Sequence, residues 1–168
     1  SKSDFGAWVL FLSIASLMEL IKHGFVRSPL IRFLAISPPG EEGRIQTASM
    51  VLNAIVGVLE VLTLFACSRI LSVFWDAPQL QSLFLIYMVS TAILVPINHF
   101  EVVQQARLQF KGTFASNFVR HFGLFIFVVI SAIAGRPIVL DHLAYAQMVA
   151  ILISGLVAYS YARPYLNF

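Results

Sequence analysis

Amide, carboxyl and thiol side chains recur every seven residues within a long apolar segment of the chain. The four positions are Gln46, Asn53, Glu60 and Cys67, and this spacing places them on one face of a helix. An ionisable group in apolar surroundings is costly unless it faces water, an ion or a partner. Glu60 is therefore predicted to point inward and to bind a cation, either H⁺ or Na⁺; a structural hydrogen bond is the alternative.

Two other apolar segments carry polar stripes of the same kind. One contains Tyr87, Thr91, Asn98 and Gln105, and the other contains Gln147, Ser154 and Tyr161. We expect Asn53, Asn98 and Gln147 to line a common interior surface, because polar helix faces avoid apolar surroundings. Packing between helices is the alternative, and it is favoured for the small residues Gly57, Ser90, Ser154 and Gly155.

Basic residues gather at two places along the chain. Lys22, Arg27 and Arg32 follow the first apolar segment, and Arg120 lies in the fourth. A topology signal combined with binding to anionic lipids accounts for such residues, and this interpretation is favoured for Arg32. Glu19 lies within one turn of Lys22, which predicts a local ion pair.

Motifs for covalent or metal-dependent catalysis are missing from the sequence. It contains no His-Glu-x-x-His, no Gly-x-Ser-x-Gly, no phosphate-binding glycine loop and no Asp-rich motif. His99 and His142 lack metal-ligand spacing, and Cys67, the single cysteine, has no partner for an internal disulfide. We therefore predict no catalytic residues, no metal site and no organic cofactor. An enzyme is the less favoured class.

The composition identifies the surroundings of these segments as a lipid bilayer. Of 168 residues, 59% are hydrophobic and 11% are charged, and the mean hydropathy is +0.86. A soluble domain is about half apolar and about one quarter charged. Soluble classes are excluded because so few charges could not cover so much apolar surface. The net charge of +3 comes without a basic run, so nucleic acid is not an expected partner.

Five apolar stretches approach the length of about 20 residues that a membrane-spanning helix needs. They lie near residues 5–21, 47–67, 80–97, 112–135 and 143–162. A membrane β-barrel would show alternating segments of about 10 residues, so we predict an all-α, polytopic transmembrane bundle with one domain over residues 1–168. Ser28 and Pro29 can start a helix. Segment 28–36 is therefore an amphipathic stretch at the inner interface or an extension of the first span.

Charge in the connections predicts the orientation of the chain, because Lys and Arg accumulate in short cytoplasmic loops. One side of the predicted bundle holds eight basic residues, and the other side holds Lys2, Arg69 and Arg136. The eight are Lys22, Arg27, Arg32, Arg44, Arg107, Lys111, Arg120 and Arg163. We therefore predict an amino end outside the cell and a carboxyl end in the cytoplasm.

Three short motifs occur along the chain in a recognisable order. They are residues 3–8 (SDFGAW), residues 19–25 (ELIKHGF) followed by 30–35 (LIRFLA), and residues 104–111 (QQARLQFK). In this order they resemble the amino-terminal lobe of the polysaccharide and lipid-linked oligosaccharide flippases of the multidrug/oligosaccharidyl-lipid/polysaccharide exporter superfamily. The resemblance covers nearly the whole chain, although Lys22 stands where that family commonly has an aspartate.

The resemblance implies both an architecture and a function. The five spans would correspond to spans two to six of a six-span lobe, and a second lobe would complete the transporter. Such proteins move polyprenyl-pyrophosphate-linked oligosaccharides across the bacterial inner (plasma) membrane by alternating access, for lipopolysaccharide or exopolysaccharide synthesis. The expected partners are the bilayer, the lipid-linked oligosaccharide and the second lobe. Lys22, Arg27 and Arg120 would attract the headgroup, and Glu60 would bind the coupling cation, H⁺ or Na⁺.

Two other functions remain open from the sequence. A drug/cation antiporter of the same superfamily would use Glu60 and neighbouring polar groups for an ion, and would have a flatter, aromatic cavity. A membrane scaffold without transport activity would use the polar stripes only for packing between helices. The two transporters predict that the polar stripes face a cavity, and the scaffold predicts that they pack against each other.

Overall fold

The computed structural model describes residues 2–36, 38, 40–135, 137 and 139–166, with side chains described from Asp4 onward. Within these ranges every regular element is helical, which confirms the predicted fold class. Five helices are long and apolar enough to cross a membrane, which confirms the predicted number of spans. The elements are α1 (Lys2–Lys22), the π-helical turn η1 (His23–Arg27), α2 (Ser28–Ala35), α3 (Glu42–Phe74), α4 (Gln79–Ala106), α5 (Phe110–Ile133), α6 (Leu140–Ala162) and the 3₁₀ turn η2 (Arg163–Tyr165).

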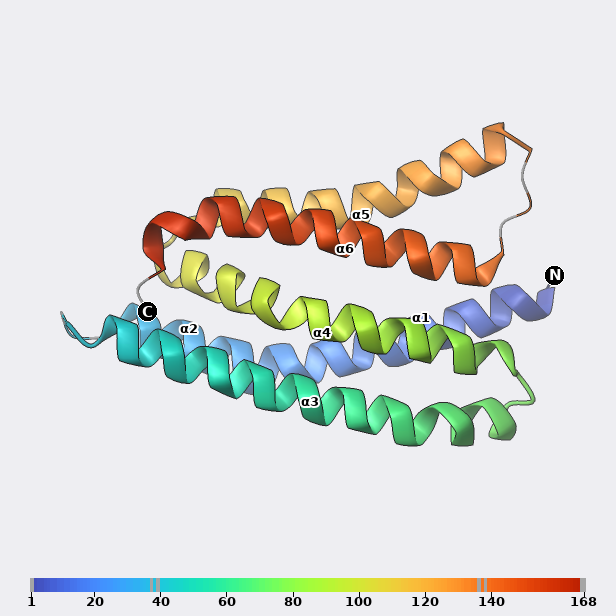
Figure 1. The fold of residues 1–168 in the computed structure, drawn as a ribbon, viewed down its shortest axis with the longest axis horizontal. Coiled ribbons are helices and arrows are strands. Elements are labelled where there is room, and N and C mark those ends of the chain that lie inside the picture. Colours follow the sequence, from blue (N-terminus) through green and yellow to red (C-terminus); the bar gives the residue numbers. More distant parts are fainter. Residues whose placement is uncertain (1, 37, 39, 136, 138, 167–168) are drawn as a thin grey trace.

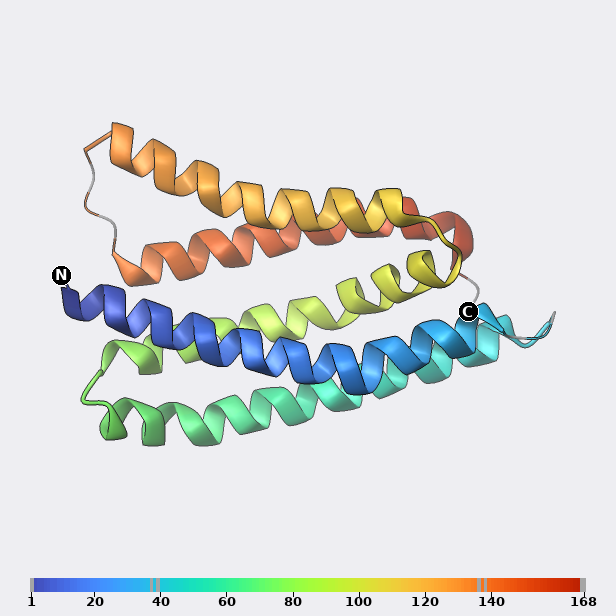
Figure 2. The ribbon, with the colours of Figure 1, turned by 180° about the vertical axis from the view of Figure 1, so that it is seen from behind.

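The long helices form an up-and-down bundle in which successive helices run antiparallel (Figure 1). One end holds α2, the start of α3, the α4–α5 connection and the end of α6. This end is called the basic end here because Arg32, Arg44, Arg107 and Arg163 belong to these segments. The opposite end, called the far end, holds the α3–α4 and α5–α6 connections. From behind, α1 and α2 are seen to run along the length of the bundle (Figure 2).

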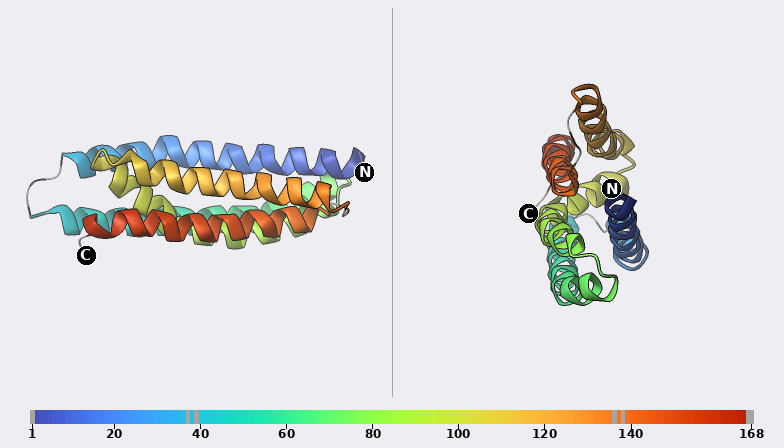
Figure 3. Two further views of the ribbon diagram at one scale, coloured as in Figure 1. Left: turned by 90° about the horizontal axis from the view of Figure 1, so that it is seen from above. Right: turned by 90° about the vertical axis from the view of Figure 1, so that its right-hand side faces the viewer.

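α4 is the central helix of the bundle. It packs against α3 and against α6, and it also contacts α1, α2 and α5. Viewed end-on, α4 lies between the α5–α6 pair and the group formed by α1 and α3 (Figure 3). The polar face of α4 is therefore within reach of groups from every other long helix.

Two apolar clusters attach α1, η1 and α2 to α4. Towards the far end, Phe11 is buried and packs edge-on against Phe84 and Tyr87, with ring centroids 5.8 and 5.5 Å away. The second cluster lies towards the basic end and contains Val26, Leu30, Leu34, Val102 and Val103. Apolar contacts therefore hold this part of the chain near both of its ends.

The outward faces of the helices are apolar and exposed, as expected for a bundle in lipid. On α5 only 6% of the most apolar window is buried, and Phe114, Phe118, Phe122 and Phe125 form a stacked row on its exposed face. The helices extend past the predicted spans: α3 has 33 residues, about 50 Å, against about 30 Å of hydrocarbon. Hydropathy marks only the apolar part of each helix, so the apolar stretches alone do not give the helix ends.

α1, η1 and α2 form one continuous helical rod. The backbone at Lys22, Arg27 and Ser28 has right-handed helical φ and ψ values, so α2 continues the first span. The structure thus has the extension that the sequence left open as an alternative, and segment 28–36 is not a separate interfacial helix. Lys22 consequently lies within the rod, whereas the sequence had placed it at the end of a span.

Candidate functional site

A cavity of about 780 Å³ lies between α1, α4, α5 and α6. The rod formed by α1, η1 and α2 contributes eight of its lining residues. All six residues predicted to bind substrate line this one cavity, and each comes from a different element: Lys22, Arg27, Asn53, Asn98, Arg120 and Gln147. The structure thus brings these six residues together around one cavity, and their binding roles stay predictions.

Lys22 and Glu60 form a buried ion pair beside the cavity. Lys22 Nζ lies 2.9 Å from Glu60 Oε2, and the two side chains are 9% and 6% exposed. Lys22 Nζ also lies 3.4 Å from Glu19 Oε1, the local pair that the spacing predicted. Glu60 points inward with an ammonium group as its partner, and its Oε1 is buried without a hydrogen-bond partner among the described residues. Cation binding by Glu60 stays a prediction.

Arg27 forms a second buried ion pair, with a carboxylate that sequence reasoning missed. A terminal nitrogen of Arg27 lies 2.7 Å from Oε2 of Glu101 on α4, and Glu101 is fully buried. Ser116 on α5 donates a hydrogen bond of 3.2 Å to Glu101 Oε1. Glu101 follows Asn98 by three residues, so its place beside the polar stripe was a signal that could have identified it.

Arg120 has no acidic partner in the part of the chain that the structure describes. Its guanidinium donates a hydrogen bond to the Asn117 side chain, one turn away on α5. Arg120 lies ten residues into α5, about 15 Å from the start of that helix. It is thus deeper than the inner end of the span, where the sequence had placed it. A cation at this depth beside a cavity is a site of attraction for an anion.

Amide side chains supply neutral hydrogen-bonding groups along the same cavity. Asn53 donates a hydrogen bond of 3.0 Å to the Ser49 carbonyl, and both residues are buried. Asn98 is buried and Gln147 is half-buried, and no hydrogen bond joins either side chain to another described residue. Because an amide offers two donors and an acceptor, these groups suit a ligand rich in hydroxyls.

The positions of three basic residues along the helices reduce the charge bias that predicted the orientation. Lys22, Arg27 and Arg120 lie within helical elements and line the cavity, so five of the eight basic residues counted on one side remain at the basic end. Three were counted on the opposite side, and one of these, Arg136, lies outside the described residues. The bias keeps its direction, and the orientation of the chain stays a prediction.

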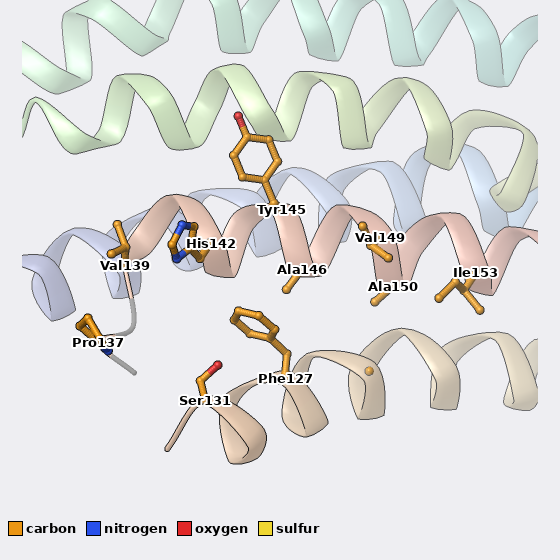
Figure 4. A pocket seen from close by; sticks show the side chains of 11 residues that line it. Phe127, Ser131, Pro137, Val139, His142, Tyr145, Ala146, Val149, Ala150 and Ile153 are labelled. Carbon is orange, nitrogen blue, oxygen red and sulfur yellow. The ribbon is translucent and has the colours of Figure 1, made fainter. Parts of the chain in front are cut away.

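A second cavity, of about 640 Å³, lies between α5 and α6 (Figure 4). Its walls are mostly apolar and include Phe127, Tyr145 and Ile153, with Ser131 and His142 as polar members. No ion pair found in the described ranges borders this space. The first cavity, with its ion pairs, arginine and amides, is therefore the candidate functional site.

Among the described residues, no three His, Cys, Asp or Glu side chains lie close enough together to bind a metal ion. His99 is fully buried, and its Nδ1 lies 3.5 Å from Ser49 Oγ within the bundle. His142, in contrast, is exposed near the start of α6. The lining of the first cavity itself consists of charged, hydrogen-bonding and apolar side chains.

Comparison with known families identifies the chain. A family model described as "Polysaccharide biosynthesis protein" matches residues 1–168, which is the whole chain. Comparison with curated proteins and with solved structures finds no match. The family agrees with the resemblance seen in the three sequence motifs and with the five membrane-span-like helices. The chain therefore belongs to the polysaccharide biosynthesis protein family and is a multi-pass membrane protein.

Proposed function

We propose that the chain is a transporter lobe that flips polyprenyl-pyrophosphate-linked oligosaccharide across the bacterial plasma membrane during lipopolysaccharide or exopolysaccharide synthesis. Alternating access against a second lobe moves the substrate, and no covalent catalysis is involved. One observation carries this proposal: Arg120, which has no acidic partner among the described residues, borders a cavity that also holds amides from three helices. Membership of a polysaccharide biosynthesis family supports the choice of substrate class.

Arg120 supplies the main contact for the pyrophosphate in this proposal. A guanidinium binds phosphate oxygens through paired, charge-assisted hydrogen bonds, each contributing about 1.5–3 kcal/mol. Asn117 orients the guanidinium from one turn away. Thr113 also lines the cavity, and its buried hydroxyl has no hydrogen-bond partner among the described residues. The Thr113 hydroxyl is thus available for a phosphate oxygen.

The amide groups bind the sugar part of the substrate. Asn53, Asn98 and Gln147 line the cavity from α3, α4 and α6, so they can contact hydroxyl groups on several sides of a saccharide. A set of separate hydrogen bonds favours a hydroxylated ligand over an apolar one, because an apolar ligand would leave these groups unpaired. The cavity is therefore suited to a glycan next to a charged headgroup.

Lys22 and Arg27 take part in headgroup binding by exchanging partners. In the structure each is held by a carboxylate, Glu60 for Lys22 and Glu101 for Arg27. If Lys22 turns to the pyrophosphate, Glu60 is left as an unpaired buried charge, which is unfavourable. Binding of a coupling cation, H⁺ or Na⁺, by Glu60 offsets that cost. This exchange links substrate binding to ion binding.

One feature of the same site favours a second function. Two carboxylates, Glu19 and Glu60, lie within 3.4 and 2.9 Å of the single ammonium group of Lys22. An excess of acid over base at this place suits a cationic ligand as well as a coupling ion. A drug/cation antiporter is therefore the second candidate, and it predicts that loss of Arg120 has little effect on transport.

The test of the proposed function is surface polysaccharide assembly in a strain that carries the full-length protein. Arg120→Gln should abolish or strongly reduce assembly, because it deletes a cation that has no acidic partner among the described residues and keeps a polar side chain. Arg44→Gln is the matched control, since Arg44 is exposed near the start of α3 and does not line the cavity. If both variants reach the membrane at equal levels and support equal assembly, the proposed substrate site is wrong.

A further inference from the structure

We propose that the π-helical turn η1 and the two ion pairs beside it form a clasp that keeps the rod of α1, η1 and α2 closed over the cavity. This inference rests on the proposed function only in taking that cavity as the transport site. The clasp consists of Lys22 with Glu60 and Arg27 with Glu101. Opening it would give a lipid-borne headgroup a route into the cavity past the rod.

The sequence explains why the helix widens at this place. Pro29 has no backbone N–H, and its ring excludes the carbonyl of the residue four positions earlier, Phe25. An α-helical hydrogen-bond pattern therefore cannot run through this turn. Instead the Ser28 N–H bonds to the His23 carbonyl, five residues back. The Ser28 hydroxyl donates a second hydrogen bond of 3.2 Å to the same carbonyl.

The wide turn brings two cations to the same side of the rod. Lys22 and Arg27 are five residues apart, which in an α-helix would place them about 140° apart around the axis. A π-helical turn uses more residues per turn and reduces that angle. Both side chains accordingly face the interior, where Lys22 is 8% exposed and the Arg27 side chain is 16% exposed. Without the turn, one of the two ion pairs would be lost.

The two pairs connect the rod to two different helices. Lys22 reaches Glu60 on α3, and Arg27 reaches Glu101 on α4. The pairs lie at the middle of the rod, between the apolar contacts of Phe11 and those of Leu30 and Leu34. The rod can therefore bend at its middle and release Val26 while the contacts of Phe11 and those of Leu30 and Leu34 stay packed, and the ion pairs are the contacts that oppose such bending.

The pairs are also incompletely satisfied, which suits contacts that open and close. Arg27 Nε and Glu60 Oε1 are buried and have no hydrogen-bond partner within the described ranges. On the other side of the turn, Phe25 is 81% exposed and no side chain of the cluster covers it. The contacts described above therefore fix the turn only on the side that faces the bundle. Single-turn π-helical segments inside α-helices are often found at functional sites.

The test is the reactivity of a cysteine placed between the two pairs. Val26→Cys is introduced into the full-length protein in a Cys67→Ala background, in membranes that a small water-soluble thiol reagent reaches from both sides. Val26 is 9% exposed, so the parent should react slowly. Glu60→Gln and Glu101→Gln should each speed the reaction about tenfold or more, because each removes one arm of the clasp. Glu42→Gln, which removes the exposed ion pair with Arg107, is the matched control and should leave the rate unchanged.

Two further variants separate opening of the clasp from general unfolding. Ala7→Cys reports on the far-end core, where Ala7 is 5% exposed, and it should stay unreactive in the Glu60→Gln protein. The charge-swapped variant Lys22→Glu/Glu60→Lys, made together with Glu19→Gln so that no like charge lies beside the new carboxylate, rebuilds the pair and should return Val26→Cys to slow reaction. Unchanged Val26→Cys rates in both Gln variants, or fast reaction in the swapped variant, would overturn the clasp. Polysaccharide assembly by Arg120→Gln tests the proposed function separately, because Arg120 takes no part in either pair.

Discussion

Lys22 of α1 and Glu60 of α3 meet at 2.9 Å in the interior of the bundle, and each side chain is less than one-tenth exposed. Glu60 lies 18 residues into a helix of 33 residues, close to its midpoint. An isolated charge at such a depth in a bilayer is costly, and partners on neighbouring helices remove most of that cost. Among the described residues, removal of Lys22 alone therefore leaves Glu60 as a buried charge without an ion-pair partner, and removal of Glu60 alone leaves Lys22 with only Glu19.

The first prediction concerns the stability of this pair. Glu60→Gln alone should lower the free energy of unfolding by about 3–5 kcal/mol, because it leaves Lys22 buried with only Glu19 beside it. The double variant Lys22→Met/Glu60→Met should be much closer to the parent, since both charges leave together. Thermal unfolding of the full-length protein in detergent measures both. A double variant as unstable as the single one would show that the two charges do not act as a pair.

The second prediction concerns the close approach of α5 to α4 and α6. A Cβ atom at Gly112 would lie 2.5 Å from Tyr161 Cβ and would collide with the Gln104 side chain. Gln104 is buried and donates a hydrogen bond of 2.9 Å to the Ala158 carbonyl, so it cannot easily move away. Gly112→Ala should therefore destabilise the bundle by about 1–3 kcal/mol.

The control for that substitution is Gly6→Ala, because nothing lies within 4 Å of the Cβ position at Gly6. Ala at this helical position should be neutral or slightly stabilising. Both variants are compared by thermal unfolding in the same detergent. Equal melting temperatures for Gly112→Ala and Gly6→Ala would mean that the helices are less tightly packed at Gly112 than the structure indicates.

The third prediction concerns the orientation in the membrane. With the basic end in the cytoplasm, Pro78→Cys at the far end should react with an impermeant thiol reagent in intact cells. Glu41→Cys at the basic end should react only after permeabilisation. Both residues are exposed, and both variants carry Cys67→Ala. The opposite pattern of labelling would refute the proposed orientation.

Helix periodicity was enough to predict which polar residues share a space, and insufficient to predict how they pair. Asn53 and Asn98 came from seven-residue stripes, and the structure places both on one cavity because a helix face is set by local geometry. The pairing of Glu101 with Arg27 could not be predicted, because the two residues are 74 positions apart in the sequence and no local spacing reports such a contact.

The depth of the charged residues in the bundle could not be predicted from the sequence either. Charges divide the apolar stretches of the sequence, and this division predicts Lys22 at the end of a span. In the structure the carboxylates of Glu60 and Glu19 allow Lys22 to lie inside the bundle, and the helix continues past it to Ala35. A charge marks the end of a span only when no partner compensates it, and the partner here lies on another helix.

The central claim is that Arg120 binds the pyrophosphate of a lipid-linked substrate. The most direct measurement is the equilibrium binding of a polyprenyl pyrophosphate to the purified full-length protein and to its Arg120→Gln, Arg120→Lys and Arg44→Gln variants. Loss of one charge-assisted contact of about 1.5–3 kcal/mol should raise the Kd about 10- to 150-fold in Arg120→Gln. Arg120→Lys should show a smaller rise, and Arg44→Gln should bind like the parent. Equal Kd values for Arg120→Gln and Arg44→Gln would contradict the account.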